Sequence, residues 1–250
     1  LLADDNVSAI VFRIESPGGM ASGCFDLTDH VFAARGKKPI HALVDDYAFS
    51  AAYALAAACD EIWVSRTGGV ASVGVCGFHD DWSAGNAKMG LKVTAVYAGK
   101  HKIDFSQDFP LSDAAKARWQ EMVDDDYVMF VDTVARYRGL DAEYVQKTEA
   151  SLYFGQKAVA AKIATRLGTW DDLVAHLGSP DVARPRDDDD TADAEFSAVA
   201  PPRAMQDAVV TAVMAEGGRA AAAGAPNVRS AADVVSPQGH LDLESAAGDS

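Results

Sequence analysis

The chain has 250 residues, 49% of them hydrophobic, and a formal net charge of −15. This acidic balance argues against a nucleic-acid-binding surface, because contacts with phosphates require clustered Lys and Arg. No run of about 18 apolar residues occurs, so the sequence predicts no membrane-spanning segment. The chain starts at Leu1 without Met or a signal peptide, and we therefore expect that its N-terminus is incomplete.

The three cysteines, Cys24, Cys59 and Cys76, are odd in number and have no Cys-x-x-Cys spacing. This pattern predicts neither a disulfide framework nor a zinc site, and a reducing compartment is the natural setting. The sequence implies no metal and no cofactor.

Apolar runs and helical patterns alternate through the first part of the chain. Strands are predicted at 7–15, 40–44 and 61–65, with helices at 24–35 and directly after Ser50. This order is typical of an α/β fold with a mostly parallel sheet and right-handed crossovers.

The next part is less regular. We expect a glycine-rich run at 70–78, a helix at 81–89, a strand at 92–97, and an irregular loop that reaches Pro110. A long helix is then predicted from Ser112 to Gly139. Two shorter helices follow, at 141–148 and 155–167.

The composition changes after residue 178. Residues 181–250 contain 13 acidic and 5 basic residues, and Phe196 is their only aromatic residue. Such a segment buries too little apolar surface to offset its ordering entropy. We therefore predict a globular domain over 1–178 and an acidic, mostly disordered tail over 179–250, with a short helix at 204–216.

Ser50 lies in a turn between the strand at 41–45 and the Ala-rich helix that follows. One interpretation is a helix N-cap, a position that serine often occupies. The other is a nucleophile, because a strand, a tight turn and a helix together expose a hydroxyl beside helix N–H groups.

A serine nucleophile needs a base, and the residues alone leave several candidates open. His79 and His101 lie near glycine-containing loops, while Lys100 and Lys102 follow the predicted strand at 92–97. A lysine serves as a base where burial favours its neutral form, and otherwise these lysines form a solvated turn.

The reaction also needs donors for an oxyanion. The backbone of Gly18 and Gly19 follows the first strand, and the Ala51 N–H lies at the helix start. Since loops at the carboxyl ends of parallel strands share one edge of the sheet, these donors are expected to converge near Ser50.

The ordered set of motifs resembles the signal peptide peptidase A family of serine peptidases, the S49 group. The resemblance covers about residues 7–178. The segments that carry it are Glu15-Ser-Pro-Gly-Gly19, Asp46-Tyr-Ala-Phe-Ser-Ala-Ala-Tyr53, Ala57-Ala-Cys-Asp-Glu-Ile62, Ala71-Ser-Val-Gly-Val75, Ala98-Gly-Lys-His-Lys102, Pro110-Leu-Ser-Asp113 and Tyr153-Phe-Gly-Gln-Lys-Ala158.

The resemblance implies a Ser–Lys dyad in which Ser50 is the nucleophile and Lys102 the general base. It also implies an oxyanion hole from Gly18, Gly19 and Ala51. The expected fold is a Clp protease/crotonase-like spiral of ββα units. Family members form homo-oligomeric rings, so Lys102 could act across an interface between subunits. Ser50 is followed by two alanines where many cellular members have two glycines.

Within the family the chain looks most similar to the phage branch of head maturation proteases and minor capsid protein C. This implies a protease that acts in the host cytoplasm or the phage prohead. Its substrates would be scaffold or capsid polypeptides and its own tail, without a nucleic-acid or membrane partner. The alternatives are a cellular peptidase that degrades membrane-released peptides and a catalytically idle structural homologue. A crotonase-like acyl-CoA enzyme fits the motifs less well.

Overall fold

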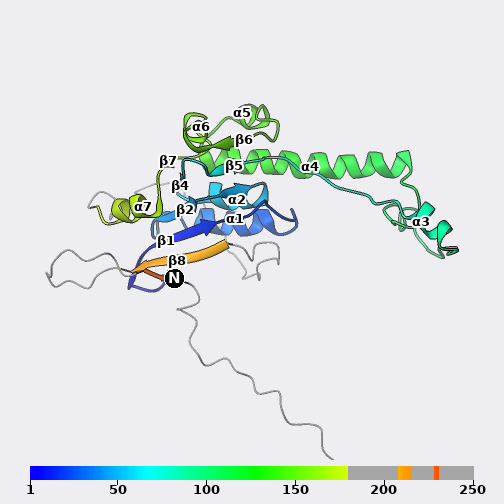
Figure 1. The fold of residues 1–250 in the computed structure, drawn as a ribbon, viewed down its shortest axis with the longest axis horizontal. Coiled ribbons are helices and arrows are strands. Elements are labelled where there is room, and N and C mark those ends of the chain that lie inside the picture. Colours follow the sequence, from blue (N-terminus) through cyan, green and yellow to red (C-terminus); the bar gives the residue numbers. More distant parts are fainter. Residues whose placement is uncertain (180–207, 215–227, 231–250) are drawn as a thin grey trace, which may run out of the picture.

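A computed structural model describes residues 1–179, 208–214 and 228–230 (Figure 1). Its main sheet has six strands in the order β7-β4-β2-β1-β8-β9, of which β7, β4, β2 and β1 are parallel. The antiparallel strands β8 and β9 extend the sheet beyond β1. The bounds are β1 Val7–Ile14, β2 Ile40–Val44, β4 Glu61–Val64, β7 Arg166–Leu167, β8 Ala208–Met214 and β9 Val228–Ser230.

A second, three-stranded sheet lies at the carboxyl ends of the parallel strands. Its order is β3-β5-β6, with β3 at Tyr47–Phe49, β5 at Gly69–Ala71 and β6 at Leu152–Phe154. The chain therefore passes from β2 into β3 and then into helix α2, Ala51–Ala58, and passes likewise from β4 into β5. These repeated pairs of strands agree with the ββα units expected from the family resemblance, and the α/β class with a mostly parallel sheet is confirmed.

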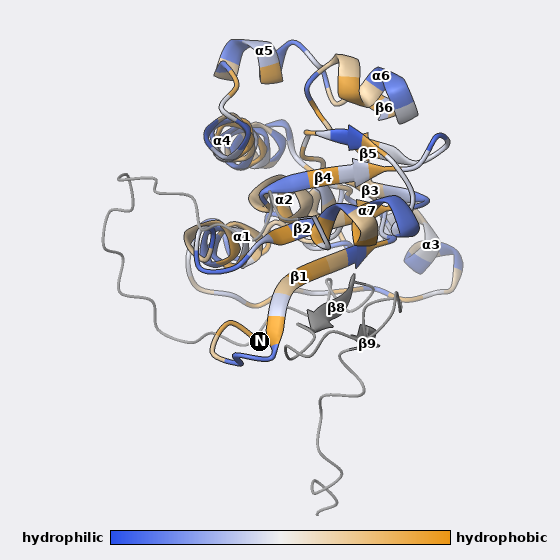
Figure 2. Ribbon diagram, turned by 90° about the vertical axis from the view of Figure 1, so that its left-hand side faces the viewer, coloured by the Kyte–Doolittle hydropathy of each residue, from blue (hydrophilic) through white to orange (hydrophobic). Residues whose placement is uncertain are grey.

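Helices cover both faces of the main sheet (Figure 2). On one face lie α1, Cys24–Ala33, α2, and the C-terminal half of α4, Asp113–Arg138. All eight residues of α2 are buried, so this helix forms the centre of the core. On the other face, Leu173 of α7, Trp170–Leu177, packs with Val11, Leu43 and Trp63.

The small side chains of α2 explain its central place. Alanines allow close approach of neighbouring backbones, and α1 and α4 pack against α2 from the side away from the sheet. Tyr53 is the one large polar side chain of this helix, and its hydroxyl donates to the Ile163 carbonyl at 2.9 Å. A buried phenol satisfied in this way stabilises the helix without leaving an unpaired group.

An arm extends from the body beyond the N-terminal half of α4 (Figure 1). It comprises residues 76–112 and includes the short helix α3, Ser83–Lys88. Its contacts include the pairing of Phe105 with Trp119, whose ring centroids are 5.1 Å apart, and the ion pair between Asp104 and Arg118. The arm is thus attached to the first turns of α4.

The predicted long helix is confirmed as α4, since the Ser112 hydroxyl accepts from the Ala115 N–H at 3.2 Å and Gly139 ends the helix at φ 61°. The helices at 141–148 and 155–167 are shorter than predicted: α5 spans Ala142–Gln146 and α6 spans Gly155–Ala160.

Two predicted elements are wrong. Residues 92–97 form no strand in the described chain, and part of the predicted helix at 204–216 is the strand β8. The remainder of the predicted acidic tail lies outside the described residues, so its predicted disorder stays a prediction. Among the described helices, none combines the length and the apolar character that a membrane crossing requires.

Candidate active site

Ser50 stands between the end of β3 and the start of α2, at the carboxyl edge of the parallel strands. Its backbone has φ 51° and ψ −125°, a conformation that non-glycine residues rarely adopt. Two hydrogen bonds hold it there: its N–H donates to the Ala71 carbonyl at 2.8 Å, and its carbonyl accepts from the Ala54 N–H at 3.0 Å. Strain of this kind, about 1–3 kcal/mol, persists where the surrounding structure fixes the residue, as it does at nucleophile elbows.

The Ser50 hydroxyl is not a helix cap. Ser50 occupies the N-cap position of α2, but its side chain makes no cap hydrogen bond. The N–H groups of the first helical turn, including that of Ala51, therefore remain available at the positive end of the helix dipole. Of the two interpretations of Ser50, the geometry favours the nucleophile.

The glycine loop lies directly against Ser50. A Cβ placed on Gly18 would come within 2.7 Å of the Ser50 Cβ and 2.9 Å of the Phe49 carbonyl oxygen, and Gly18 has φ 118°. The loop is tied to β3 because the Ser16 N–H donates to the Tyr47 carbonyl at 2.9 Å. Only glycine fits this position, so the loop backbone can approach Ser50.

The sequence does not predict the roles of two features in this loop region. The buried Ser16 hydroxyl accepts from the Gly18 N–H at 3.2 Å, so Gly18 is held by Ser16 in this structure. Ala71 and Ser72 have φ 89° and 58°, and the Ser72 N–H donates to the Ser151 carbonyl at 3.2 Å. Ser16, Ala71 and Ser72 all lie within the motifs that resemble family S49. A positive φ at a non-glycine residue, as at Ala71 and Ser72, has no sequence signature.

The buried thiols do not compete with Ser50 as nucleophiles. Burial raises the pKa of Cys24 to about 11 and that of Cys59 to about 12. A thiol held in its protonated form is unreactive at neutral pH. The Cys24 thiol lies 3.8 Å from the Ala51 carbonyl oxygen, which places the start of α1 beside the start of α2.

Lys102 is not brought to Ser50 within one chain. It lies exposed in a turn of the arm, where its N–H donates to the Gly99 carbonyl at 3.1 Å, and Lys100 is exposed in the same turn. The two histidine candidates also belong to the arm: His101 pairs with Asp104 at 2.9 Å, and His79 contacts the Ser106 carbonyl at 3.1 Å. All four base candidates thus belong to the arm, away from Ser50.

Helix α4 gives the scale of this separation. Its Phe130 contacts Phe25 near the start of α1, with ring centroids 5.8 Å apart. Helix α2 begins beside the same end of α1, because the Cys24 thiol lies next to the Ala51 carbonyl. The arm attaches at Trp119, eleven residues earlier, which is about 16 Å along a helix. A lysine side chain spans roughly 6 Å and cannot bridge such a gap from the same chain.

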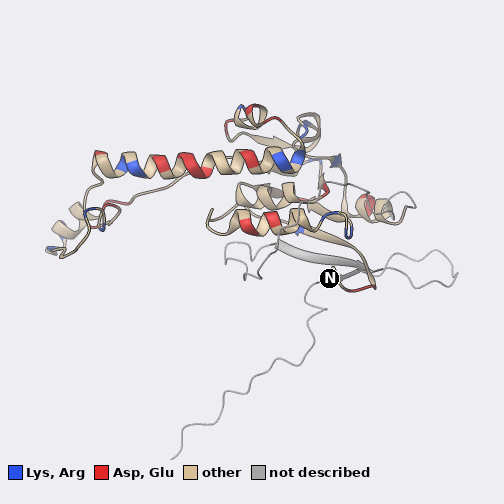
Figure 3. Cartoon of the chain, turned by 180° about the vertical axis from the view of Figure 1, so that it is seen from behind, with Lys and Arg blue, Asp and Glu red and all other residues tan. Residues whose placement is uncertain are grey.

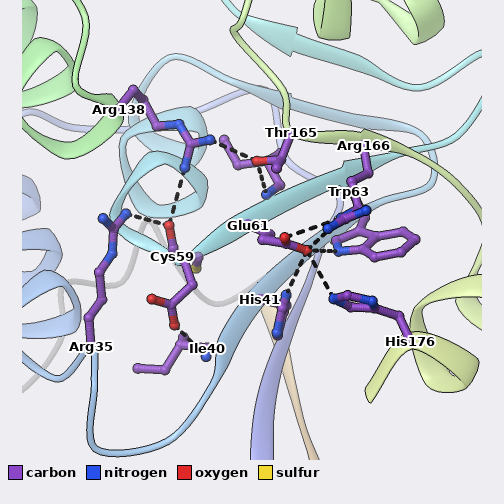
Figure 4. Close-up of polar contacts among 12 residues, drawn as sticks. Arg35, Ile40, His41, Cys59, Glu61, Trp63, Arg138, Thr165, Arg166 and His176 are labelled. Atoms are coloured by element: carbon purple, nitrogen blue, oxygen red, sulfur yellow. Dashed lines mark hydrogen bonds and ion pairs between the residues drawn. The ribbon is translucent and has the colours of Figure 1, made fainter. Parts of the chain in front are cut away.

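The opposite edge of the sheet has a structural role (Figure 4). Glu61 accepts from the Trp63 indole at 3.0 Å and from Arg166 at 3.0 Å, and His41 and His176 face the same carboxylate. This cluster joins β2, β4, β7 and α7. Among the described residues, no group of three or more His, Cys, Asp or Glu side chains could hold a metal ion.

Comparison with known proteins agrees with the motifs. The family model for peptidase family S49 matches residues 33–181. The head-tail preconnector protein GP5 of Enterobacteria phage P21 is 36% identical over 71% of this chain and 36% of its own length. The capsid assembly protease C of Escherichia phage lambda is 34% identical over 69% of this chain and 39% of its own length. Protease 4 of Salmonella typhi is 26% identical over 69% of this chain and 28% of its own length.

The chain thus spans between a third and two fifths of the length of the two phage relatives. The matched region contains the Ser50 elbow, helix α2 and the arm with Lys102. From the family match and the identity to the phage relatives, we conclude that this chain belongs to peptidase family S49.

Proposed function

We propose that this chain is the catalytic domain of a phage capsid-maturation protease that cleaves polypeptides with a Ser50–Lys102 dyad. The observation that carries the proposal is the backbone of Ser50. Its strained conformation, its uncapped hydroxyl and its contact with Gly18 form a nucleophile elbow at the start of a buried helix.

The chemistry follows from these groups. Ser50 Oγ attacks the scissile carbonyl carbon while its proton passes to the neutral Nζ of Lys102, and the carbonyl oxygen becomes an oxyanion. We assign the N–H groups of Ala51 and Gly19 to the stabilisation of that oxygen, and the hydrogen bond from the Gly18 N–H to the Ser16 hydroxyl supports the orientation of the loop. The C–N bond then breaks, and the lysine proton goes to the leaving amine. Water, deprotonated by the same lysine, releases the acyl group from Ser50.

In this proposal Lys102 comes from a second copy of the chain. The separation along α4 keeps the lysine of one chain away from its own Ser50, whereas exposure in the arm leaves it accessible to a neighbour. A homo-oligomeric ring would complete one such site at each contact between neighbouring subunits.

The names of the two phage relatives suggest the setting. Proteins described as a capsid assembly protease and a head-tail preconnector protein indicate work during head assembly. We therefore propose scaffold or capsid polypeptides as substrates, with residues 179–250 of the chain itself as a further one, and the prohead in the host cytoplasm as the location.

Cleavage by matched variants tests the proposal. The purified chain is incubated alone and with an unfolded polypeptide such as casein, and the products are identified by mass spectrometry. Ser50→Ala and Lys102→Ala are expected to lower the cleavage rate by at least about 10³-fold, since each removes a member of the dyad. Lys100→Ala is the control, because Lys100 lies exposed in the same turn, and it should keep cleavage within about 3-fold.

Cleavage that persists in Ser50→Ala would exclude Ser50 as the nucleophile. Cleavage that is lost in Lys100→Ala and kept in Lys102→Ala would move the base to Lys100. An inactive wild-type chain that also fails to react with a fluorophosphonate probe would favour the idle structural homologue.

A further inference from the structure

Strained backbone is concentrated around Ser50. In the described chain six non-glycine residues have a positive φ, and five of them lie in three segments that neighbour one another. They are Ser50 itself, Ala71 and Ser72 after β5, with φ 89° and 58°, and Glu149 and Ala150 before β6, with φ 48° and 55°. Residues other than glycine rarely adopt such values, and they keep them only where the surrounding structure fixes the backbone.

The pair before β6 belongs to a turn that α5 holds in place. This turn comprises residues 148–151. The Ser151 N–H donates to the Thr148 carbonyl at 2.8 Å, and the buried Thr148 hydroxyl donates to the Val145 carbonyl of α5 at 2.7 Å. The turn leads directly into β6, so its position is fixed at both ends.

The 148–151 turn packs against the chain that leaves β5. The Ser72 N–H donates to the Ser151 carbonyl at 3.2 Å. A Cβ placed on Gly74 would come within 2.8 Å of the Ala150 Cβ, so the two segments touch without room for a further methyl group. The antiparallel pairing of β5 with β6 continues from this contact. The path of the chain just after β5 is therefore set by the turn.

The Ala71 carbonyl connects this contact to Ser50. It accepts from the Ser50 N–H at 2.8 Å, and Ala71 pairs with Phe49 in the parallel β3–β5 ladder. The direction of this carbonyl is that of the peptide between Ala71 and Ser72, because a peptide unit is planar. That peptide in turn is held by the bond from Ser72 to Ser151. A rotation of the peptide would remove the acceptor of the Ser50 N–H.

The Ser50 side of this connection is uncharged. Helix α2, strand β5 and residues 72–76 contain no Lys, Arg, Asp or Glu (Figure 3). The hold on Ser50 therefore depends on backbone hydrogen bonds and close packing rather than on ion pairs. We expect it to be insensitive to the salt concentration.

We propose that the 148–151 turn is a positioning element for Ser50 that acts through the peptide between Ala71 and Ser72. The turn keeps this peptide in its strained orientation, and the peptide keeps the backbone of Ser50 in its own. The residues of the turn are positioning residues, which take no part in bond making or breaking. The effect on catalysis rests on the proposed function, whereas the hold on the Ser50 backbone does not.

Gly74 and Ala150 provide a matched test. Gly74 has no positive φ, so the alanine in Gly74→Ala meets only the Ala150 Cβ, and one of the two segments must move. When Gly74→Ala is combined with Ala150→Gly, that Cβ is gone, and the nearest remaining contact is the Cα of residue 150 at 4.0 Å. The combination therefore separates the clash from any other effect of an alanine at position 74.

Amide exchange at Ser50 measures the hold directly. The full chain carries Lys102→Ala to limit self-cleavage, and hydrogen exchange is followed residue by residue. We expect Gly74→Ala to raise the exchange rate of the Ser50 amide by at least about 10-fold. The Ile10 amide, which donates across the main sheet at 2.8 Å, should stay within about 3-fold of the parent. Relative to Ala150→Gly alone, the double variant should stay within about 3-fold at both amides.

Cleavage by chains that keep Lys102 is the second measurement. With a fluorogenic casein, Gly74→Ala should lower kcat by at least about 10-fold and leave KM within about 3-fold, because a displaced Ser50 impairs the chemical step more than binding. The double variant should match Ala150→Gly. Gly178→Ala is the control: Gly178 also lacks a positive φ, and its Cβ would make only ordinary contacts, the nearest at 3.6 Å.

Thr148→Val tests the turn without a clash. It keeps the shape of the side chain and removes the hydrogen bond to the Val145 carbonyl. The exchange rate of the Ser50 amide should rise by about 3-fold or more, while that of the Ile10 amide stays at the parental value. This variant decides the question if Gly74→Ala does not fold.

A Ser50 amide that exchanges at the parental rate in folded Gly74→Ala, or in Thr148→Val, would overturn the positioning element. So would a double variant that fails to recover, or an equal rise at Ser50 and Ile10, which marks a general loss of stability. The outcome is separable from that of the proposed function. A chain that cleaves nothing but shows the expected exchange keeps the positioning element and loses the protease. Cleavage that needs Ser50 and Lys102 but is unaffected by Gly74→Ala keeps the protease and loses the positioning element.

Discussion

Gly18 lies directly against Ser50, and its lack of a side chain makes this close contact possible. We predict that Gly18→Ala lowers cleavage by at least about 100-fold, since the new Cβ must displace Ser50 or the loop that faces it. Gly36→Ala is the control, because Gly36 also has a positive φ, 78°, but nothing lies within 4 Å of its missing Cβ. It should cost about 1–3 kcal/mol of stability and leave the specific activity unchanged. Equal losses of activity in both variants would contradict the account of the loop.

His41 shows how a buried residue couples stability to pH. Burial, partly offset by the carboxylates of Glu61 and Asp60, lowers the pKa of His41 well below its ordinary value. The groups that face it across the cluster are Glu61, Arg166 and His176. Because the unfolded chain then takes up the proton first, the free energy of unfolding should fall as the pH drops below about 6.5.

Glu61 also lowers the free energy of unfolding as the pH falls, but at a lower pH than His41 does. Its burial alone would raise the pKa, but the hydrogen bond from Arg166 and the neighbouring positive charges lower it below its usual range. Stability from Glu61 is present above the ordinary carboxyl pKa and is lost as the pH falls through the lowered value.

Urea unfolding between pH 7.5 and 4.5 measures both effects. We predict that His41→Asn removes a slope of up to about 1.4 kcal/mol per pH unit between pH 6.5 and 5. An unchanged slope in this variant would show that His41 does not titrate as the structure implies.

At the scale of elements, Arg35 links α1, α2 and α4. Its guanidinium donates to the Ala57 and Ala58 carbonyls at 2.8 Å each, and also to the Cys59 and Tyr137 carbonyls. These bonds satisfy the carbonyls at the C-terminal end of α2, the helix that begins at Ser50.

We predict that Arg35→Lys lowers the free energy of unfolding by about 2–4 kcal/mol, because an ammonium cannot reproduce the planar set of donors. Lys37→Ala, at an exposed position two residues later, should change it by less than about 0.5 kcal/mol. Chemical denaturation measures both, and a small effect of Arg35→Lys would mean that water caps α2 equally well.

The elements that the sequence predicts well are those with local signals. Ser112 and Gly139 mark the two ends of α4. The alternation of strands and helices up to Val64 predicts the parallel sheet. By contrast, β3 has only three residues, and its place depends on Ser16 and β5, which the local sequence does not reveal. The run at 92–97 has strand propensity but no ladder partner within the described chain, and propensity alone does not make a strand.

In the candidate site, too, the features with local sequence signals are predicted and those that depend on the three-dimensional path of the chain are not. Ser50 and Gly18 follow strands that end at one edge of the sheet, so the sequence predicts that they converge, and they do. The pairing of Lys102 with Ser50, which the family resemblance implies and which could form across an interface, stays a prediction, since the arm of a single chain holds Lys102 away from its own Ser50. The roles of Ser16 and Ala71 depend on backbone geometry, which no composition or spacing indicates.

At the scale of the whole molecule, we propose that the active site forms between two copies of the chain. In this proposal one copy provides Ser50, Ala51 and the glycine loop, and another provides Lys102. In a heterologous ring each subunit would donate its lysine in one direction and receive one from the other. Inactive variants should therefore complement each other when they assemble together.

The direct measurement is cleavage by Ser50→Ala and Lys102→Ala chains co-expressed at equal levels and purified as one complex. We predict that each variant alone is inactive and that the mixed complex regains about a quarter of wild-type activity, since random assembly pairs an intact serine with an intact lysine at about one site in four. A mixed complex that is proven by mass spectrometry to contain both chains and yet stays inactive would contradict a site shared between copies.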